Sequence, residues 1–75
     1  MSDDAVRNPS HYAGDGVTDC MTAMRSMVSG AECTPMYAFA WCNALKYLWR
    51  HWRKGGTEDL EKCKEYIDIM IGGGR

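Results

Sequence analysis

The chain has 75 residues, with nine lysines and arginines against ten aspartates and glutamates, and a formal net charge of −1. A chain this short holds at most one domain, and its near-zero charge predicts no strong attraction to polymeric nucleic acid or to an anionic membrane. No apolar run reaches the roughly 18 uncharged residues of a membrane-spanning helix. We therefore expect a small soluble domain whose partners are neither membranes nor polymeric nucleic acid.

The two ends of the chain are poorly suited to a core. The run Asn8-Pro9-Ser10-His11-Tyr12 contains a proline that favours extended or turn geometry. Residues 1–16 are therefore predicted as an N-terminal arm or loop, residues 17–71 as a single helical domain, and residues 72–75 as a flexible glycine-rich tail. A domain of this size usually needs a disulfide, a metal or a partner subunit to be stable.

The cysteines Cys20, Cys33, Cys42 and Cys63 do not lie at the short spacing of a zinc knuckle, and neither histidine falls at ligand spacing from them. The start of the chain lacks the basic and apolar pattern of a secretory leader, so we expect reduced thiols rather than disulfides. We predict no bound metal. Cys20, Cys42 and Cys63 are interpreted as small apolar residues inside helices.

Three helices are predicted, and no strand. Apolar residues that recur three and four positions apart predict a first helix over about residues 17–29. Thr34 followed by Pro35 is a start signal, because the hydroxyl can cap free amides and proline has no amide to lose. The second helix is predicted over about residues 35–54, where a glycine pair ends it.

The third helix is predicted over about residues 57–71. Thr57 is expected to cap it, and Glu58 with Lys62 forms an i, i+4 pair on its solvated side. Its apolar residues share one face: Leu60, Cys63, Ile67, Met70 and Ile71.

The second helix is unusually apolar, because its large apolar residues are distributed around most of the cylinder instead of along one stripe. Two neighbouring helices can cover only part of that circumference, and the remaining aromatic patch would be too large for a monomer. The sequence therefore predicts an all-α three-helix protein that forms a helical homo-oligomer, with a tetramer favoured. The predicted interface residues are Trp41, Leu45, Leu48, Trp49 and Trp52.

The polar residues of the same helix share one stripe. Lysine and arginine are suited to phosphate oxygens, a tyrosine ring can stack on a base, and an asparagine can read a base or ribose edge. The alternative is that the stripe is only the solvated face that a helix needs. The predicted ligand-binding residues on this stripe, at helical spacing, are Asn43, Lys46, Tyr47, Arg50 and Lys54.

The arm contributes Ser10, His11 and Tyr12 to the predicted site, because this turn-prone segment can close over a ligand. The alternative is an ordinary surface loop. No histidine and acid pair is identifiable beside Ser10 for nucleophilic chemistry, and we predict no catalytic residue.

Asp59, Glu61 and Glu65 follow the basic end of the second helix. They are interpreted first as solvent-facing acids, which are favourable near a helix N-terminus. The alternative is that Asp59 crosses the glycine turn to orient Arg50 or Lys54, or helps to bind a magnesium nucleotide. A Gly-rich Walker loop is missing, which excludes a conventional P-loop kinase.

Several of these motifs together resemble a phage family, the SaV-like proteins catalogued as domain of unknown function 3310, which is similar to a phage nucleotide kinase family. The resemblance spans about residues 8–71. It implies a phage-encoded protein in the host bacterial cytoplasm and a nucleotide ligand. The segments that carry it, besides residues 8–12, are Gly14 and Gly16, residues 43–50, Lys54-Gly55, residues 58–62 and Tyr66-Ile67.

The first functional hypothesis is an oligomeric sponge, without a cofactor, that sequesters cyclic-nucleotide signals of host anti-phage defence of the CBASS or Thoeris type. Abundant phosphate-binding groups without a catalytic apparatus favour it, and so short a chain leaves little room for a closing lid. The second is a Walker-less deoxynucleoside monophosphate kinase that uses ATP and magnesium. The third is an adaptor that binds a host enzyme. Under the first hypothesis, oligomerisation is expected to build the pocket as well as the core.

Overall fold

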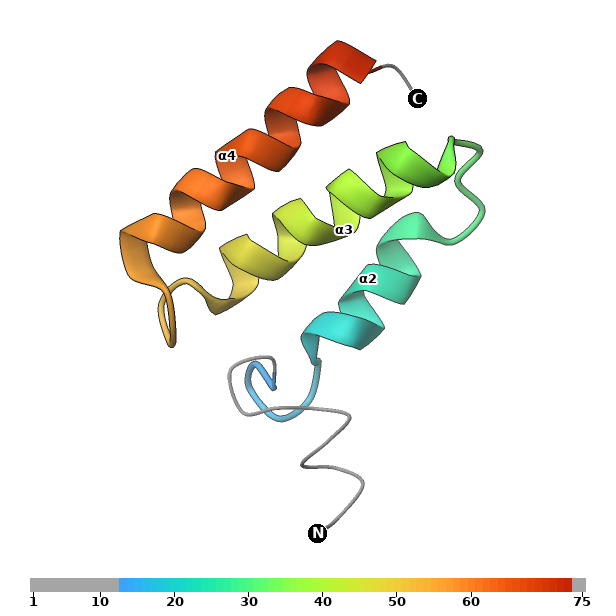
Figure 1. Cartoon of the computed structure of the whole chain (residues 1–75). Coiled ribbons are helices and arrows are strands. Elements are labelled where there is room, and N and C mark those ends of the chain that lie inside the picture. The colour runs from blue at the N-terminus through green and yellow to red at the C-terminus, as the bar shows by residue number, and fades with distance from the viewer. Residues whose placement is uncertain (1–12, 74–75) are drawn as a thin grey trace, which may run out of the picture.

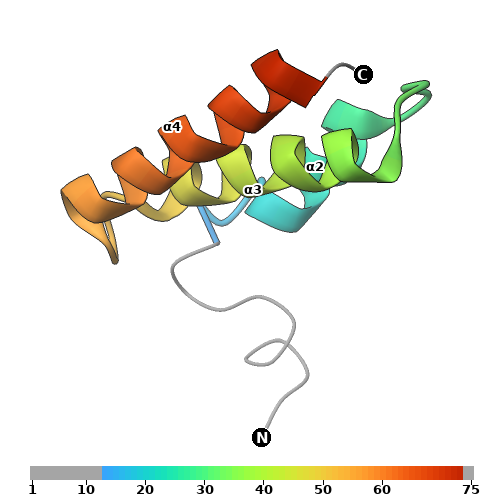
Figure 2. The same ribbon diagram turned by 45° about the horizontal axis from the view of Figure 1, so that its top comes forward.

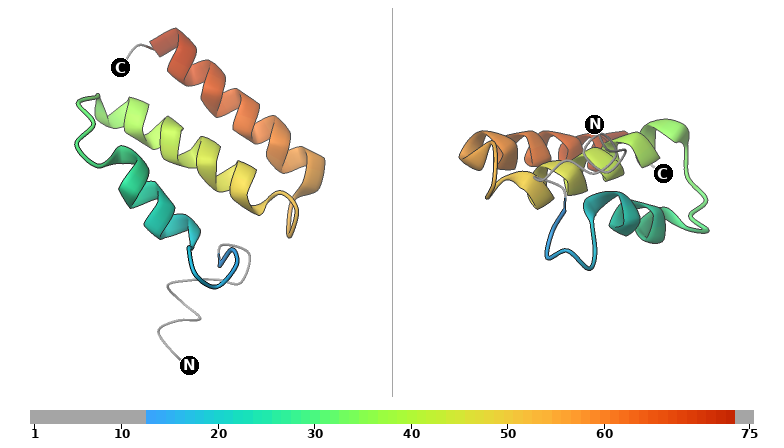
Figure 3. Two further views of the ribbon diagram at one scale, coloured as in Figure 1. Left: turned by 180° about the vertical axis from the view of Figure 1, so that it is seen from behind. Right: turned by 90° about the horizontal axis from the view of Figure 1, so that it is seen from below.

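The computed structural model describes residues 13–73 of the chain. Within this range the helices are α2 (Cys20–Val28), α3 (Pro35–Arg50) and α4 (Gly56–Gly73), and there is no strand. Consecutive helices run in opposite directions, with α3 between the other two (Figure 1). Helices α3 and α4 lie side by side, whereas α2 is set off to one side of the layer that they form (Figures 2 and 3). The prediction of a small, three-helix, all-α fold is confirmed.

Helix α2 begins at Cys20 instead of the predicted residue 17, because side-chain caps compete for the preceding amides. The Asp15 carboxylate accepts hydrogen bonds from the Val17 and Thr18 amides at 2.8 and 3.0 Å. Asp19 then caps the helix by accepting from the Thr22 amide at 2.7 Å. Val17, the first apolar residue of the predicted helix, consequently lies before it and is 89% exposed.

Helix α3 starts as predicted, with the Thr34 hydroxyl accepting from the Tyr37 amide at 3.2 Å and Pro35 in the first turn. It ends at Arg50 instead of the predicted residue 54. Residues 51–55 form turns, closed by a 2.7 Å hydrogen bond from the Gly56 amide to the His51 carbonyl. The basic segment after α3 is therefore a tight corner rather than a last helical turn.

Helix α4 begins at Gly56, so that Thr57 lies within the helix and not at its cap. The Gly55 amide instead donates to the Asp59 carboxylate at 3.1 Å. The expected pair between Glu58 and Lys62 forms at 3.4 Å. The helix continues through Gly73, beyond the predicted end at residue 71.

The residues buried in the core are small. Among residues 13–73 the buried apolar residues are Cys20, Ala40, Ala44 and Cys63, and the only buried charged residue is Asp59. Small side chains at these positions let the three helices pack closely, but they remove little apolar area from water. No helix in the described part of the chain has both the length and the apolar character needed to cross a bilayer.

Candidate anion-binding site on helices α3 and α4

An ion pair between Arg50 and Asp59 connects the end of α3 to the first turn of α4. Arg50 donates from Nε to Oδ2 at 2.9 Å and from Nη2 to Oδ1 at 3.2 Å, a two-point geometry that favours strong pairing. The Asp59 residue is 1% exposed. The hydrogen bond from Arg50 is the main cause of a lowered Asp59 pKa. The interpretation of Asp59 as a solvent-facing acid was wrong, and the alternative that it crosses the turn to hold Arg50 is confirmed.

This pairing changes the roles open to both residues. The Arg50 side chain is 15% exposed, and its Nε and Nη2 both point at the carboxylate. Its charge is therefore largely offset inside the protein. The Asp59 carboxylate is in turn held by Arg50 and by the Gly55 amide, which leaves it poorly placed to coordinate magnesium. Within residues 13–73, no group of three histidines, cysteines or acids is arranged to hold a metal ion.

Tyr47 of α3 is surrounded by cations. Its ring stacks on Tyr66 of α4, with the ring centroids 5.8 Å apart and the planes inclined by 13°. The Lys46 ammonium lies 4.3 Å from the Tyr47 centroid, the Arg50 guanidinium carbon 4.8 Å and the Lys62 ammonium 5.4 Å. Each of these distances falls within the range of a cation–π interaction. The two tyrosines thus form a rigid platform that gathers three positive groups from two helices.

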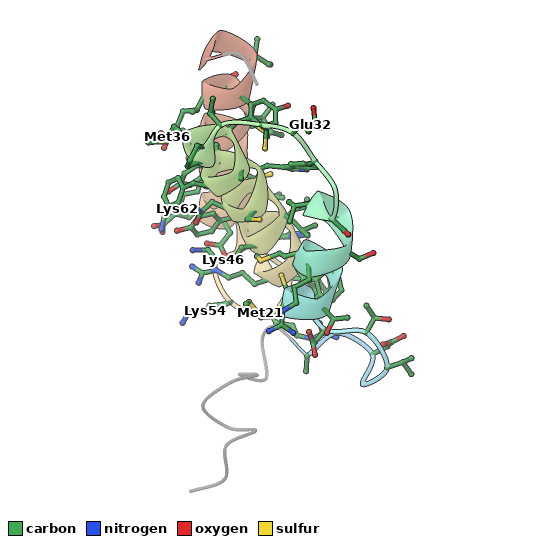
Figure 4. The ribbon with its side chains drawn as sticks, turned by 90° about the vertical axis from the view of Figure 1, so that its right-hand side faces the viewer. Met21, Glu32, Met36, Lys46, Lys54 and Lys62 are labelled. Atoms are coloured by element: carbon green, nitrogen blue, oxygen red, sulfur yellow. The ribbon has the colours of Figure 1, made fainter. Side chains whose placement is uncertain are left out.

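The positive charge of this platform is only partly neutralised. Arg50 is paired with the buried Asp59, and Lys62 makes an exposed 3.4 Å contact with Glu58. For Lys46, no carboxylate of residues 13–73 lies within ion-pair distance. Lys46, Lys54 and Lys62 lie on one side of the molecule (Figure 4). We call the surface made by Lys46, Tyr47, Lys62 and Tyr66 the cation–aromatic site.

Lys46 also lies beside a cavity next to α2. Together with Cys20, Met21 and Met24 it lines a cavity of about 180 Å³. Packing of the lysine stem against apolar side chains, with the ammonium directed to a polar surface, is the usual arrangement for a half-buried lysine. The Lys46 side chain therefore lies between this cavity beside α2 and the Tyr47 ring of its own helix.

Asn43 and Phe39 extend the cation–aromatic site toward the start of α3. The Asn43 side-chain nitrogen donates to the Phe39 carbonyl at 2.8 Å. Phe39 is 52% exposed and meets Tyr66 edge to face, at 5.9 Å and 74°. Sequence reasoning did not place Phe39, Lys62 or Tyr66 in the site. Phe39 lies four positions before Asn43, so this spacing could have identified it as a neighbour of the site. Lys62 and Tyr66 belong to α4, and they become neighbours of Tyr47 only because the two helices pack together.

The structure separates Trp49 from the other predicted interface residues. At Gly14, whose φ is +66°, an added Cβ would lie 2.8 Å from the Trp49 ring, so this loop packs closely on the indole. The Arg53 side chain reaches the same loop, donating to the Gly14 carbonyl at 3.3 Å. Trp49 therefore supports the loop that precedes α2. Ser10, His11 and Tyr12 lie outside the described residues, and their role in the site stays a prediction.

Three predicted interface residues of α3 do come together. They line an open apolar groove of about 230 Å³ to which all three helices contribute. Trp52, in the turn after α3, is 87% exposed. The groove is lined by Trp41, Leu45 and Leu48 with Ala44, and by Met27, Cys63, Ile67 and Met70 from the neighbouring helices.

The fold and the site together define a small all-α protein that carries a cation-rich aromatic cluster and an open apolar groove. The sequence matches the DUF3310 family, described as proteins of unknown function, over residues 6–68. Because the match covers more than half of the chain, the protein belongs to the DUF3310 family. No curated protein and no solved structure matches the chain. The family resemblance is confirmed, whereas the phage origin and the similarity to kinases stay predictions.

Proposed function

We propose that this protein binds a nucleotide through the cation–aromatic site and acts as an oligomeric sponge for cyclic-nucleotide signals in the cytoplasm of a phage-infected bacterium. The observation that carries the proposal is the convergence of Lys46 and Lys62 on one tyrosine ring, at 4.3 and 5.4 Å. Two ammonium groups beside one ring carry like charges, and an anion bound next to both reduces their mutual repulsion. Phosphate is an anion to which lysine and tyrosine can both donate hydrogen bonds.

The ligand also has an apolar part in this proposal. The Tyr47 ring is already stacked on Tyr66, so we assign it to holding the lysines and not to stacking on a base. Phe39 is half exposed and lies beside the same platform, which makes it the ring available for a base. Phe39 and Lys46 are seven residues apart, or about 10 Å along the helix, a separation suited to the base and the phosphate of one nucleotide. Lys54 supplies a further cation for a second phosphate.

The burial of Asp59 and its pairing with Arg50 favour sequestration of the nucleotide over phosphoryl transfer. A kinase would need a carboxylate at this site to hold magnesium, and Asp59 and its neighbour Glu58 are the candidates. Asp59 is buried against Arg50, and Glu58 is paired with Lys62 at the helix surface. Within residues 13–73 neither carboxylate belongs to a group of three histidines, cysteines or acids arranged to hold a metal ion. The site thus has groups that bind phosphate but lacks, among residues 13–73, an arrangement that would transfer it.

The test is calorimetric titration of the purified protein with cyclic di- and trinucleotides, deoxynucleoside monophosphates and inorganic phosphate. We expect a cyclic nucleotide to bind and to be recovered chemically intact after the protein is denatured by heat. No binding across the panel, or recovery of an altered nucleotide, contradicts the proposal. Formation of a diphosphate product from ATP, magnesium and a monophosphate would instead support the kinase.

Helix α4 offers a matched control for the site. Lys62 and Lys64 are two positions apart, so their side chains leave opposite sides of the helix. Lys62→Ala is expected to weaken binding about tenfold, the loss of one charge-assisted hydrogen bond, and Lys64→Ala to leave it unchanged. Equal effects of the two variants would mean that overall charge, and not this site, attracts the ligand.

A further inference from the structure

The cation–aromatic site adjoins a cavity between α2 and α3, and the two share one residue. The cavity, of about 180 Å³, is lined by Cys20, Met21 and Met24 of α2 and by Lys46 of α3. The Lys46 ammonium lies 4.3 Å from the centroid of the Tyr47 ring. An anion bound at this ammonium therefore has the cavity as its neighbour, and a group attached to the anion can enter it.

The size and the lining of this cavity suit one aromatic ring. An apolar cavity of about 150 Å³ is large enough to bind benzene, so about 180 Å³ has room for a single ring. Two methionines line it, and their polarisable thioether groups make favourable contacts with aromatic rings. Met21 is 43% exposed, so one wall lies at the protein surface, where the polar edge of a nucleobase can keep its contact with water.

The cavity and the Phe39 ring lie toward different neighbours of α3. Phe39 meets Tyr66 of α4 edge to face at 5.9 Å, whereas the cavity is lined by α2. Helix α3, which carries Lys46, runs between α2 and α4 (Figure 1). A phosphate at Lys46 is thus flanked by one ring site toward α4 and a second toward α2. A mononucleotide has a base for only one of these sites, whereas a dinucleotide has a base on each side of its linking phosphate.

We propose that the cavity between α2 and α3 binds one base of a dinucleotide, a pyrimidine, while a phosphate of the same ligand contacts Lys46 and the other base contacts Phe39. The ligand of the proposed function, on which this inference rests, is then a nucleotide with two bases. The base in the cavity is a pyrimidine because pyrimidines consist of a single ring. Helix α2 takes part in binding through Met21 and Met24.

Methionine methyl NMR of the wild type observes the cavity directly. The probes are phenyl phosphate, which joins one ring to one phosphate, and a cyclic dinucleotide of two uridylates. We expect both to shift the methyl signals of Met21 and Met24 through the ring current, and inorganic phosphate to leave them in place. The reference is Met27, which lines the apolar groove instead. Unchanged Met21 and Met24 signals with both probes, or equal shifts of Met24 and Met27, overturn the proposal.

Two alanine variants of α2 form a matched pair. Met24 and Met27 are both half-buried, but Met24 lines the cavity and Met27 lines the groove. Met24→Ala is expected to weaken binding of the cyclic dinucleotide about tenfold, the loss of one stacked base. It should weaken uridine monophosphate much less, because the single base of that ligand can contact Phe39. Met27→Ala should leave both affinities unchanged. Equal losses in the two variants, or equal losses of the two ligands in Met24→Ala, overturn the proposal.

The link between the cavity and Lys46 is tested with a variant that keeps an apolar stem. Lys46→Met retains an unbranched side chain beside the cavity but removes the ammonium. Phenyl phosphate should bind about tenfold more weakly, the loss of one charge-assisted hydrogen bond. Phenol, which has the ring without the phosphate, should be affected much less. Equal losses for the two probes would show that the cavity and the ammonium do not bind one ligand together, which overturns the proposal.

The same titrations keep this inference separate from the proposed function. Nucleotide binding that leaves the Met21 and Met24 signals unchanged contradicts only the inference. If phenyl phosphate shifts both signals but no nucleotide binds, the proposed function is wrong, and the nucleotide part of the inference falls with it.

Discussion

Arg50 of α3 and Asp59 of α4 are joined by two hydrogen bonds across the turn that connects their helices, and the aspartate is almost completely buried. Asp59→Asn keeps the shape but removes the charge that offsets Arg50. We expect the variant to lose about 2 kcal/mol of unfolding free energy, as for a hydrogen bond to a charged partner. Urea unfolding followed by circular dichroism measures the loss.

The neighbouring surface pair provides the control for this prediction. Glu58→Gln removes the exposed ion pair with Lys62 from the same helical turn. An exposed pair contributes little, so the change should be below about 0.5 kcal/mol. Equal losses in Asp59→Asn and Glu58→Gln would contradict the structural role of the buried pair.

The same ion pair predicts how stability depends on pH. The hydrogen bond from Arg50 lowers the Asp59 pKa in the folded protein below its usual value of 3.8. As the pH falls, the unfolded chain therefore takes up a proton first, and the contribution of Asp59 is present in full above pH 5 and is lost progressively below about pH 4. Asp15 and Asp19, whose pKa values are lowered by backbone amides, act in the same direction. Unfolding free energies of wild type and Asp59→Asn should converge between pH 5 and the acid limit, and a constant difference would contradict the assignment.

Gly55 is required for the approach of Asp59. A Cβ at Gly55 would overlap the Asp59 carboxylate, whereas a Cβ at Gly72 meets nothing. Gly55→Ala should therefore destabilise the protein by about as much as Asp59→Asn, because it displaces the carboxylate from Arg50. Gly72→Ala should stabilise the protein by up to about 1 kcal/mol, since alanine is the better helix former. Thermal unfolding of the two variants checks both signs, and stabilisation by Gly55→Ala would refute the contact.

The cysteines are predicted to differ in reactivity. Burial raises the pKa of the Cys20 and Cys63 thiols, which leaves less thiolate for alkylation. Cys33 is only partly buried, in the segment that precedes α3. A short pulse of iodoacetamide at pH 8, followed by peptide mass spectrometry, should label Cys33 first. Cys20 and Cys63 should be labelled only when urea opens the fold, and rapid native labelling of Cys63 would show that α3 and α4 separate readily.

Local sequence signals predicted the middle helix start and the order of the elements. Thr34 and Pro35 act on amides within one turn, so their effect is visible without knowing the fold. The start of α2 was missed because Asp15 and Asp19 offer their own side-chain acceptors to the backbone, which outweighs the apolar periodicity at Val17. The end of α3 was also missed, because the sequence predicts the stop at the glycine pair, whereas the turns already begin at His51.

The candidate site was recovered in part. Asn43, Lys46 and Tyr47 share one stripe by spacing alone, and the structure places them on one surface with Lys62 and Tyr66. Spacing along one helix cannot reveal a partner on another helix. It therefore missed the α4 half of the site, and it did not show that Arg50 is held by Asp59.

The sequence by itself determined that this protein is all-helical, that its middle helix has more apolar surface than two neighbours can cover, and that cations line one stripe of that helix. These properties follow from periodicity and capping, which act over a few residues. Only the tertiary structure decided that Arg50 is paired with Asp59, that Trp49 supports a loop, and that Lys46 and Lys62 both lie beside the Tyr47 ring. Those contacts depend on how helices far apart in the chain pack, because burial and charge pairing are set by neighbours in space.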